Sequence, residues 1–312
     1  MNIYQILVPT DFSEYSQCAF NYAIQFAKKL NASLTLIHVE VILHSLQPEA
    51  IFGKSKIESS IRSTLEDMES QLQEMVDQAE KEGVQANFTV IQGKSAAQSL
   101  LDYVQKHPMD LVIMGTHGRT GIKHFLLGSI AEKMVRMSPI PVLTVHKSIT
   151  DFRLKNILIP VDFSEYSYKA LDYGEYLASQ FQSEITLLHV VETLPYPTFY
   201  PEGFTPAMDF IPNLQQRIDE SLQNLLKDSS VPVHRIIRTG TPSPEIVHFA
   251  QQTGQDLIIL TTRGLTGLEH ILIGSTTERV VRISETPVLT IPSKVGDPSS
   301  TQLNLSDSEE NA

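Results

Sequence analysis

The pattern of apolar and polar positions changes between two periods along the chain, and the order of these changes repeats once. Short runs of Val, Ile and Leu, typical of buried strands, alternate with stretches that carry an apolar residue every three or four positions, typical of amphipathic helices. We expect strands in the first half (residues 1–150) at 3–8, 33–39, 86–92, 110–114 and 141–145, and in the second half (151–312) at 156–161, 184–191, 232–238, 256–260 and 287–291.

Helices are predicted in the gaps between these strands. One follows the first strand of each half, with Ser13 and Ser164 as N-caps. The others are expected at 57–82, 95–107, 129–137, 212–228, 242–253 and 275–283. Strands that alternate with helices form parallel βαβ units with right-handed crossovers. The pattern therefore predicts an α/β protein made of two tandem open parallel five-stranded α/β sandwiches of the Rossmann-like kind.

An internal repeat gives the division into domains. Residues 6–16 return as residues 157–167 with nine of eleven positions identical. A period near 150 residues is far longer than a solenoid unit of roughly 20–50 residues, and it suits two complete domains. We expect domains at 1–147 and 153–293, joined by a polar linker. Residues 294–312 are rich in Ser, Asp and Glu and are expected to form a disordered acidic tail.

Composition narrows the classes of partner and compartment. The net charge is −12, with 13 Lys/Arg against 15 Asp/Glu in residues 1–150 and 11 against 21 in residues 151–312. Nucleic acid is not expected as a partner, because phosphate contacts need a basic face. No apolar run approaches the roughly 20 residues of a membrane span. The single cysteine excludes an internal disulfide, and the N-terminus lacks the pattern of a secretory signal, so we expect a cytoplasmic protein.

The residues best suited to bind a ligand follow the strand predicted at 110–114. Gly115 and Gly118 lack Cβ and allow the backbone to turn sharply and to approach a ligand. Gly128 and Ser129 open the next helix, where free N–H groups and the helix dipole favour an anion. Taken alone, these glycines are equally consistent with ordinary turns and helix capping.

Three motifs together resemble the universal stress protein family. They are Gly-x2-Gly-x9-Gly-Ser after a hydrophobic strand, Val-Pro-Thr-Asp after the first strand, and Leu-Ile-His-Val in the second strand. The resemblance covers residues 2–146 and 153–292 as a tandem pair. It implies an adenine nucleotide α-hydrolase-like fold that holds ATP, with or without Mg²⁺, at the switch point of the sheet.

The resemblance also implies a set of binding residues in the first half. Pro9, Thr10, Asp11 and Val39 would line the adenosine pocket, and Met114, Gly115, Gly118, Gly128, Ser129 and Ile130 would surround ribose and phosphates. Ala131 stands where ATP-binding members often have a hydroxyl residue, which removes one phosphate contact.

The second half departs from the motif, because Thr261 replaces its first glycine. A β-branched residue is a poor substitute where a positive φ or a close phosphate approach is needed. The expected second site is therefore weaker. Its residues are Pro160, Val161, Asp162, Val190, Gly264, Gly274, Ser275, Thr276 and Thr277.

Other chemistry is less well supported by the residues. His38 and His189 occupy equivalent strand ends, but no carboxylate or thiol cluster accompanies them at metal-ligand spacing, so hydrogen-bonded structural histidines are expected. No nucleophile or general-base constellation stands out, and we name no catalytic residue and expect at most slow ATP hydrolysis. The leading hypothesis is an ATP-binding protein that signals or protects during stress. The alternative is a nucleotide-independent scaffold protein.

The last strand of each half predicts how the halves meet. Pro141–Val145 and Pro287–Ile291 are apolar edge strands, and an exposed apolar edge pairs readily unless it is covered. In single-domain proteins of the family that the chain resembles, this strand pairs antiparallel between subunits. We therefore expect an intramolecular pseudo-dimer of the two halves. The sequence leaves open whether two chains then form a homodimer.

Overall fold

The computed structural model describes residues 1–42, 54–117, 127–146, 152–192, 214–263 and 273–293. The first half contains β1 (Gln5–Pro9), α1 (Glu14–Leu30), β2 (Ser33–Val41), α3 (Lys54–Lys81), β3 (Ala86–Gly93), α4 (Ala96–Lys106), β4 (Leu111–Gly115), α5 (Ser129–Met137) and β5 (Val142–Val145). The second half contains β6 (Asn156–Pro160), α6 (Ser167–Phe181), β7 (Glu184–Glu192), α8 (Leu214–Asn224), β8 (Val233–Gly240), α9 (Pro242–Thr253), β9 (Leu257–Thr261), α10 (Ser275–Ile283) and β10 (Val288–Ile291).

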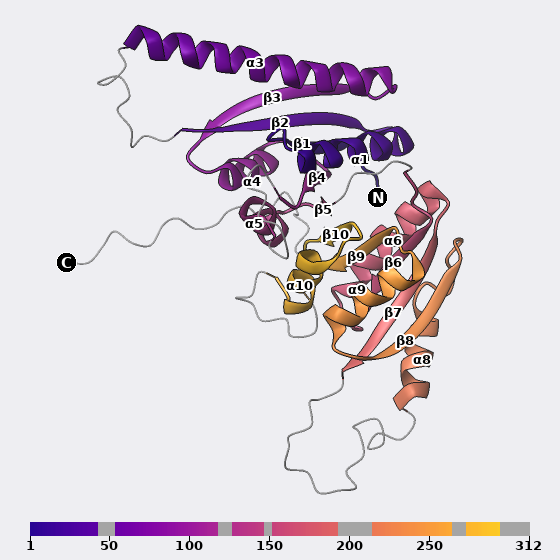
Figure 1. Cartoon of the computed structure of the whole chain (residues 1–312). Coiled ribbons are helices and arrows are strands. Elements are labelled where there is room, and N and C mark those ends of the chain that lie inside the picture. The colour runs from indigo at the N-terminus through magenta and orange to yellow at the C-terminus, as the bar shows by residue number, and fades with distance from the viewer. Residues whose placement is uncertain (43–53, 118–126, 147–151, 193–213, 264–272, 294–312) are drawn as a thin grey trace, which may run out of the picture.

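All ten strands belong to one continuous sheet with the order β3-β2-β1-β4-β5-β10-β9-β6-β7-β8. Pairing is parallel within each half and antiparallel where β5 meets β10. Figure 1 shows the first half above and the second half below this junction, with α3 and α8 at the two far ends. The predicted α/β architecture of two parallel five-stranded units is confirmed.

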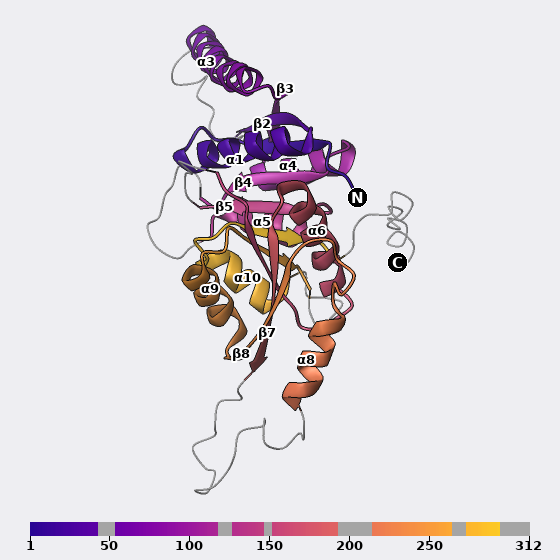
Figure 2. The ribbon, with the colours of Figure 1, turned by 90° about the vertical axis from the view of Figure 1, so that its right-hand side faces the viewer.

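Helices cover both faces of the sheet because successive strand residues point to opposite faces. In β1, Ile6 and Val8 join the apolar core under α1, α3, α6 and α8, while Leu7 joins the core under α4, α5, α9 and α10. Figure 2 shows this layering clearly for the second half, with α9 and α10 on one side and α6 and α8 on the other. Each core contains residues of both halves. No helix among the described residues is long and apolar enough to cross a membrane.

The two edge strands pair as the sequence predicts. Leu143 of β5 lies opposite Leu289 of β10, and both side chains are buried. Two reciprocal hydrogen bonds extend the pairing: the Thr144 hydroxyl donates to the carbonyl of Val288 (3.2 Å), and the Thr290 hydroxyl donates to the carbonyl of Val142 (3.1 Å). The halves therefore meet like the two subunits of a symmetric dimer.

Three helix predictions were wrong at their ends. The helix expected at 57–82 begins three residues earlier, at Lys54. The Ser164 hydroxyl does accept a hydrogen bond from the Ser167 N–H (3.3 Å), but α6 begins only at Ser167, two residues later than α1 in the aligned repeat. The helix expected at 212–228 ends at Asn224, because Leu226 adopts a left-handed φ of 50° that cannot continue a helix. Residues 193–212, a segment rich in proline and aromatic residues, and the predicted tail at 294–312 lie outside the described residues.

Candidate functional site

The turn after β1 explains why Asp-Phe-Ser occurs in both halves. The Asp11 carboxylate accepts a hydrogen bond from the Ser13 N–H (3.1 Å), and the Thr10 hydroxyl accepts one from the Phe12 N–H (3.1 Å). Within this turn Phe12 has a φ of 63°, a conformation that an aromatic residue rarely adopts, and Phe163 repeats it at 60°. Ser13 then caps α1, and its hydroxyl accepts from the Ser16 N–H (3.3 Å). The turn places Asp11 at the carboxyl edge of the sheet.

His38 is a hydrogen-bonded residue, as predicted. Its Nδ1 lies 2.8 Å from the carbonyl oxygen of Thr10, and its ring stacks on Phe12 with 5.0 Å between centroids. His189 repeats the arrangement with Val161 at 2.8 Å. Within the described part of the chain, no three His, Cys, Asp or Glu side chains are grouped as a metal site would require.

Gly115 ends β4 beside the first turn of α1. A Cβ at this position would lie 2.8 Å from the carbonyl carbon and oxygen of Tyr15, closer than side chains pack. Gly115 does not have a positive φ. A glycine is therefore needed at position 115 because the α1 backbone approaches closely. The expectation that a sharp turn requires this glycine was wrong.

Gly128 is the N-cap of α5, with a φ of −61°. Its N–H donates to the carbonyl of Thr116 (2.7 Å), and an added Cβ would lie 2.8 Å from that same oxygen. The start of α5 is thus fixed directly against the end of β4. Consequently the free N–H groups of the first helical turn face the carboxyl edge of the sheet.

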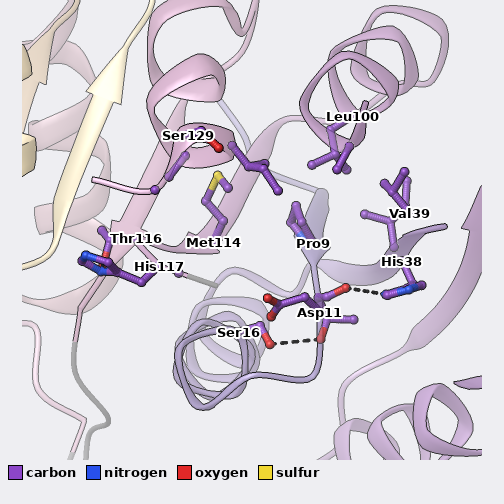
Figure 3. A pocket seen from close by; sticks show the side chains of 17 residues that line it. Pro9, Asp11, Ser16, His38, Val39, Leu100, Met114, Thr116, His117 and Ser129 are labelled. Carbon is purple, nitrogen blue, oxygen red and sulfur yellow. Dashed lines mark hydrogen bonds between the residues drawn. The ribbon is translucent and has the colours of Figure 1, made fainter. Parts of the chain in front are cut away.

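These segments enclose a cavity of about 370 Å³, shown in Figure 3. It lies between the ends of β1, β2 and β4 and the first turns of α4 and α5. Its lining residues are Pro9, Thr10, Asp11, Ser16, Ile37, His38, Val39, Ala96, Leu100, Met114, Gly115, Thr116, His117, Gly128, Ser129, Ile130 and Ala131. We call this cavity the first-half pocket.

Nine of the ten first-half residues named from the sequence line this pocket, and the tenth, Gly118, lies outside the described residues. The sequence analysis did not name Ser16, Ile37 or Thr116 as binding residues, although Ile37 and Thr116 lie within the motifs. It also missed Ala96 and Leu100, which α4 contributes from a segment without any motif. Only the folded position of α4 could have identified them.

The second half repeats the backbone of the site. The Gly274 N–H donates to the Thr262 carbonyl at 2.7 Å, the same distance as in the first half. The Asp162 carboxylate accepts from the Ser164 N–H (3.0 Å) and hydroxyl (2.6 Å). At equivalent positions along the carboxyl edge lie Pro160, Val161, Val190, Ser275, Thr276 and Thr277, while Gly264 lies outside the described residues.

The side chains of the second half differ where the motif departs. The Thr261 hydroxyl donates to the carbonyl of Arg263 (2.6 Å), and the Thr277 hydroxyl donates to the carbonyl of Thr261 (2.7 Å). Both threonines are buried. The hydroxyl of Thr277, which the sequence offered as a phosphate contact, is therefore engaged inside the protein. Thr261 stands at the position of Gly115, and the adjoining helix α6 begins two residues later than α1 does in the aligned repeat.

Comparison with known proteins gives relatives of both one and two such units. A universal stress protein of Methanocaldococcus jannaschii is 34% identical over 140 residues, which cover 44% of this chain and 81% of the relative. A universal stress protein of Mycolicibacterium smegmatis is 26% identical over 300 residues, which cover 92% of this chain and 97% of the relative.

The solved structures and the family comparison give the same result. The crystal structure of a universal stress protein from Archaeoglobus fulgidus superposes with a TM-score of 0.71 at 22% identity, covering 94% of this chain and 98% of that one, which shows a shared fold. The sequence model of the universal stress protein family matches residues 3–146 and again residues 153–292. This chain therefore belongs to the universal stress protein family and carries its domain twice in tandem.

Proposed function

We propose that this protein binds ATP in the first-half pocket and acts in the stress response through its nucleotide-bound state, by signalling or protection. One observation carries the proposal: residues from three separate sequence motifs line a single cavity of about 370 Å³ at the carboxyl edge of a parallel sheet. Ligands of open α/β sheets bind at this edge, at the switch point of the strand order. That point lies between β1 and β4.

The pocket has walls that suit an adenosine group. Ile37, Val39, Leu100 and Met114 supply apolar surface on opposite sides, from β2, α4 and β4. An aromatic base gains most from such flat apolar contacts, while a few polar groups orient it. Asp11, at the mouth of the turn after β1, would accept a hydrogen bond from the nucleoside, and the backbone of Val39 would lie near the base.

The first turn of α5 would hold the phosphates. This helix has nine residues, and the N–H groups of Ser129, Ile130 and Ala131 have no partner within the helix. Together with the helix dipole they favour an anion. Asp11 is the one carboxylate among the described residues of the lining, so Mg²⁺ would be carried mainly by the phosphates.

The second half would bind nucleotide more weakly. Thr277 donates its hydroxyl to the carbonyl of Thr261, and Thr261 brings a side chain to the place of Gly115. The second half also carries most of the net negative charge, with 21 Asp/Glu against 11 Lys/Arg in residues 151–312. A phosphate-bearing ligand is less favoured in such surroundings.

A pair of equivalent substitutions tests the proposal. Ser129→Asp places a carboxylate where the phosphates would bind, whereas an acidic residue in the first turn of a helix stabilises the fold. We expect ATP affinity, measured by titration calorimetry, to fall by at least about tenfold, which corresponds to roughly 1.4 kcal/mol. Ser275→Asp makes the same change at the start of α10 and is the matched control, with an expected loss below about twofold of the measured affinity.

Three results would decide against parts of this proposal. Equal losses from both substitutions would contradict the preference for the first half. No saturable ATP binding by the parent protein, together with no co-purified nucleotide in denaturing mass spectrometry, would favour the nucleotide-independent scaffold. Rapid release of ADP from bound ATP would point to an enzyme.

A further inference from the structure

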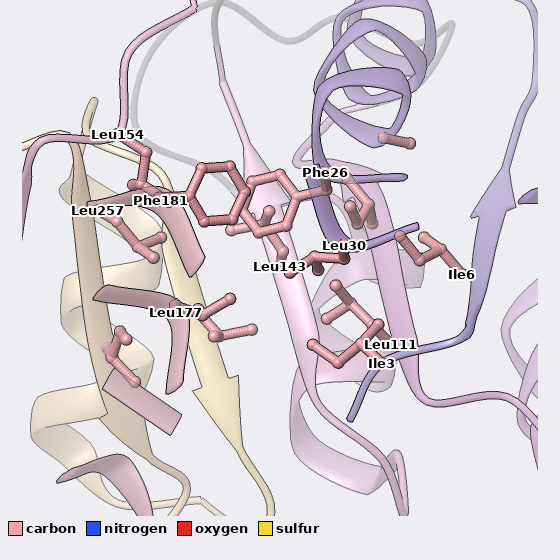
Figure 4. Packing of buried hydrophobic residues seen from close by; sticks show 14 of the residues in the cluster. Ile3, Ile6, Phe26, Leu30, Leu111, Leu143, Leu154, Leu177, Phe181 and Leu257 are labelled. Carbon is pink, nitrogen blue, oxygen red and sulfur yellow. The ribbon is translucent and has the colours of Figure 1, made fainter. Parts of the chain in front are cut away.

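A second cavity, of about 310 Å³, lies where the two halves meet on the face of α1 and α6. We call it the junction cavity. Its apolar side is formed by Phe181 of α6 and by Phe152, which follows the linker. The ring of Phe26 on α1 lies 5.1 Å from that of Phe181 and 6.0 Å from that of Phe152. Figure 4 shows Phe26 and Phe181 facing each other across the junction.

Four cationic side chains line the remaining part of this cavity. Lys28 and Lys29 belong to the last turn of α1 in the first half, while Arg153 and Lys155 precede β6 in the second half. All four residues are exposed. Such a concentration is unexpected in a chain with 24 Lys/Arg against 36 Asp/Glu. The positive charges also come from both halves, so a ligand bound here would contact both.

The internal repeat allows these four cationic positions to be compared with their counterparts on the equivalent surface of the other half. Tyr4 and Lys155 are structurally equivalent, because their N–H groups donate to Asp110 and Asp256 at 2.8 Å each. The helices α1 and α6 both end at left-handed residues, Asn31 and Gln182. With this alignment, the counterparts of Lys28, Lys29, Arg153 and Lys155 are Ser179, Gln180, Asn2 and Tyr4. The equivalent surface therefore carries none of the four charges.

Ordinary structural roles do not account for the three lysines of the cluster. Basic residues in the last turn of a helix compensate its dipole, but α6 has none there and ends with the same cap geometry. The Lys28–Glu82 ion pair (2.8 Å) joins two side chains that are 41% and 49% exposed, and such pairs contribute little. Lys155 reaches the carbonyl of Gln182 at a long 3.5 Å. Both lysines can turn toward a ligand at small cost.

We propose that the junction cavity binds a small polyanion with phosphate groups, either a free oligophosphate or the phosphate chain of a nucleotide. Ammonium and guanidinium groups form strong charge-assisted hydrogen bonds with phosphate oxygens. Two cations from each half would hold the ligand, so its binding would tie the halves together. The site lies apart from the first-half pocket and shares no lining residue with it.

Inorganic pyrophosphate is the probe for this site. Calorimetry at low salt should give one saturable site per chain that ATP bound in the first-half pocket does not remove. The double variant Lys29→Gln, Lys155→Gln should lose at least about tenfold in pyrophosphate affinity, because charge-assisted contacts are lost. The double variant Lys94→Gln, Lys227→Gln removes the same charge from exposed positions elsewhere and should stay within about twofold of the parent.

The outcomes separate this site from the proposed nucleotide site. Unchanged pyrophosphate affinity in the Lys29/Lys155 variant, equal losses in both double variants, or the absence of saturable binding would each overturn the junction site. A Lys29/Lys155 variant that keeps ATP affinity but loses pyrophosphate would support it, and Ser129→Asp should show the reverse. If excess ATP displaces pyrophosphate from the Ser129→Asp variant, whose first-half pocket no longer holds ATP, the occupant is the nucleotide phosphate chain; if it does not, the occupant is a free oligophosphate.

Discussion

The end of β4 and the start of α5 share their backbone hydrogen bonding with the end of β9 and the start of α10, but the side chains at these positions differ. In both, the glycine before the helix donates to the residue after the strand at 2.7 Å. In the first half, Gly115 and Ala131 leave space that belongs to a cavity. In the second half, Thr261 and Thr277 stand at these positions and bond to each other.

The two differences, Thr261 in place of Gly115 and Thr277 in place of Ala131, occur together with a later start of the neighbouring helix α6. Gly115 is required by the backbone of Tyr15, which the first turn of α1 brings close. The aligned Tyr166 is the N-cap of α6 and lies in a turn that the Ser167 N–H closes on the Ser164 carbonyl (3.1 Å), and beside this different helix start the second half has a threonine. We infer that a duplicated domain can accept a side chain at this strand end when the start of the adjoining helix also changes.

The largest expected effect comes from exchanging the strand-end residues between the halves. Gly115→Thr forces a side chain against the Tyr15 backbone and should lower the free energy of unfolding by about 3 kcal/mol, as overpacking does. Thr261→Gly removes one hydrogen bond and adds backbone entropy, for a loss of about 1–2 kcal/mol. Urea unfolding of both variants measures the difference. Equal losses would mean that the close helix turn is not what excludes a side chain.

Much of the fold could be predicted because it depends on local pattern. The apolar runs of β1 and β6, and the turn that the Asp11 carboxylate closes, recur in the sequence as they do in space. The pairing of β5 with β10 followed from two uncovered apolar edges. By contrast, Ser13 and Ser164 are identical residues followed by helices that start at different positions, so the start of α6 depends on tertiary packing.

The candidate site was predictable only as far as its residues lie in motifs. Asp11 and Ser129 could be named because a strand end and a helix start predict where they lie. Ala96 and Leu100 reach the pocket from α4, and nothing in their local sequence distinguishes them from other core positions. The left-handed Phe12 was equally hidden; Phe163 repeats its conformation beside Asp162 and without a counterpart of the Thr10 hydroxyl, so the shared feature is the turn that the aspartate closes.

A smaller effect is expected at the third residue of α10 and of α5. Thr277→Ala removes the hydroxyl that donates to the buried carbonyl of Thr261 and should lower the free energy of unfolding by about 1–2 kcal/mol. Ala131→Thr adds that hydroxyl to the first half, where it has the Gly115 carbonyl as the equivalent acceptor. Its effect should stay below about 1 kcal/mol if the shared frame accommodates it. A large loss from Ala131→Thr would show that the two frames differ more than their backbone bonds indicate.

The smallest effect concerns Tyr22 and Tyr173, which are equivalent in the repeat. The charge of an aspartate in the other half acts on each of them. Burial, and then the charge of Asp256 in the other half, raise the pKa of Tyr22 to about 12. Burial, with Asp110, also raises the pKa of Tyr173. Because the unfolded chain releases the phenolic proton near pH 10, the stabilisation is full below that pH and is lost as the pH rises toward 12.

Tyr22→Phe should therefore reduce the fall in thermal midpoint between about pH 9 and pH 11, while leaving the pH dependence near neutrality as in the parent. Tyrosinate absorbance of the folded protein should lose its last-titrating component in this variant. Tyr173→Phe should act in the same direction, since its phenol faces the reciprocal aspartate. Tyr168→Phe is the control, because that side chain is 54% exposed. An unchanged alkaline slope in Tyr22→Phe would mean that the junction does not protect this phenol, and the reciprocal contact between the halves would lose its main support.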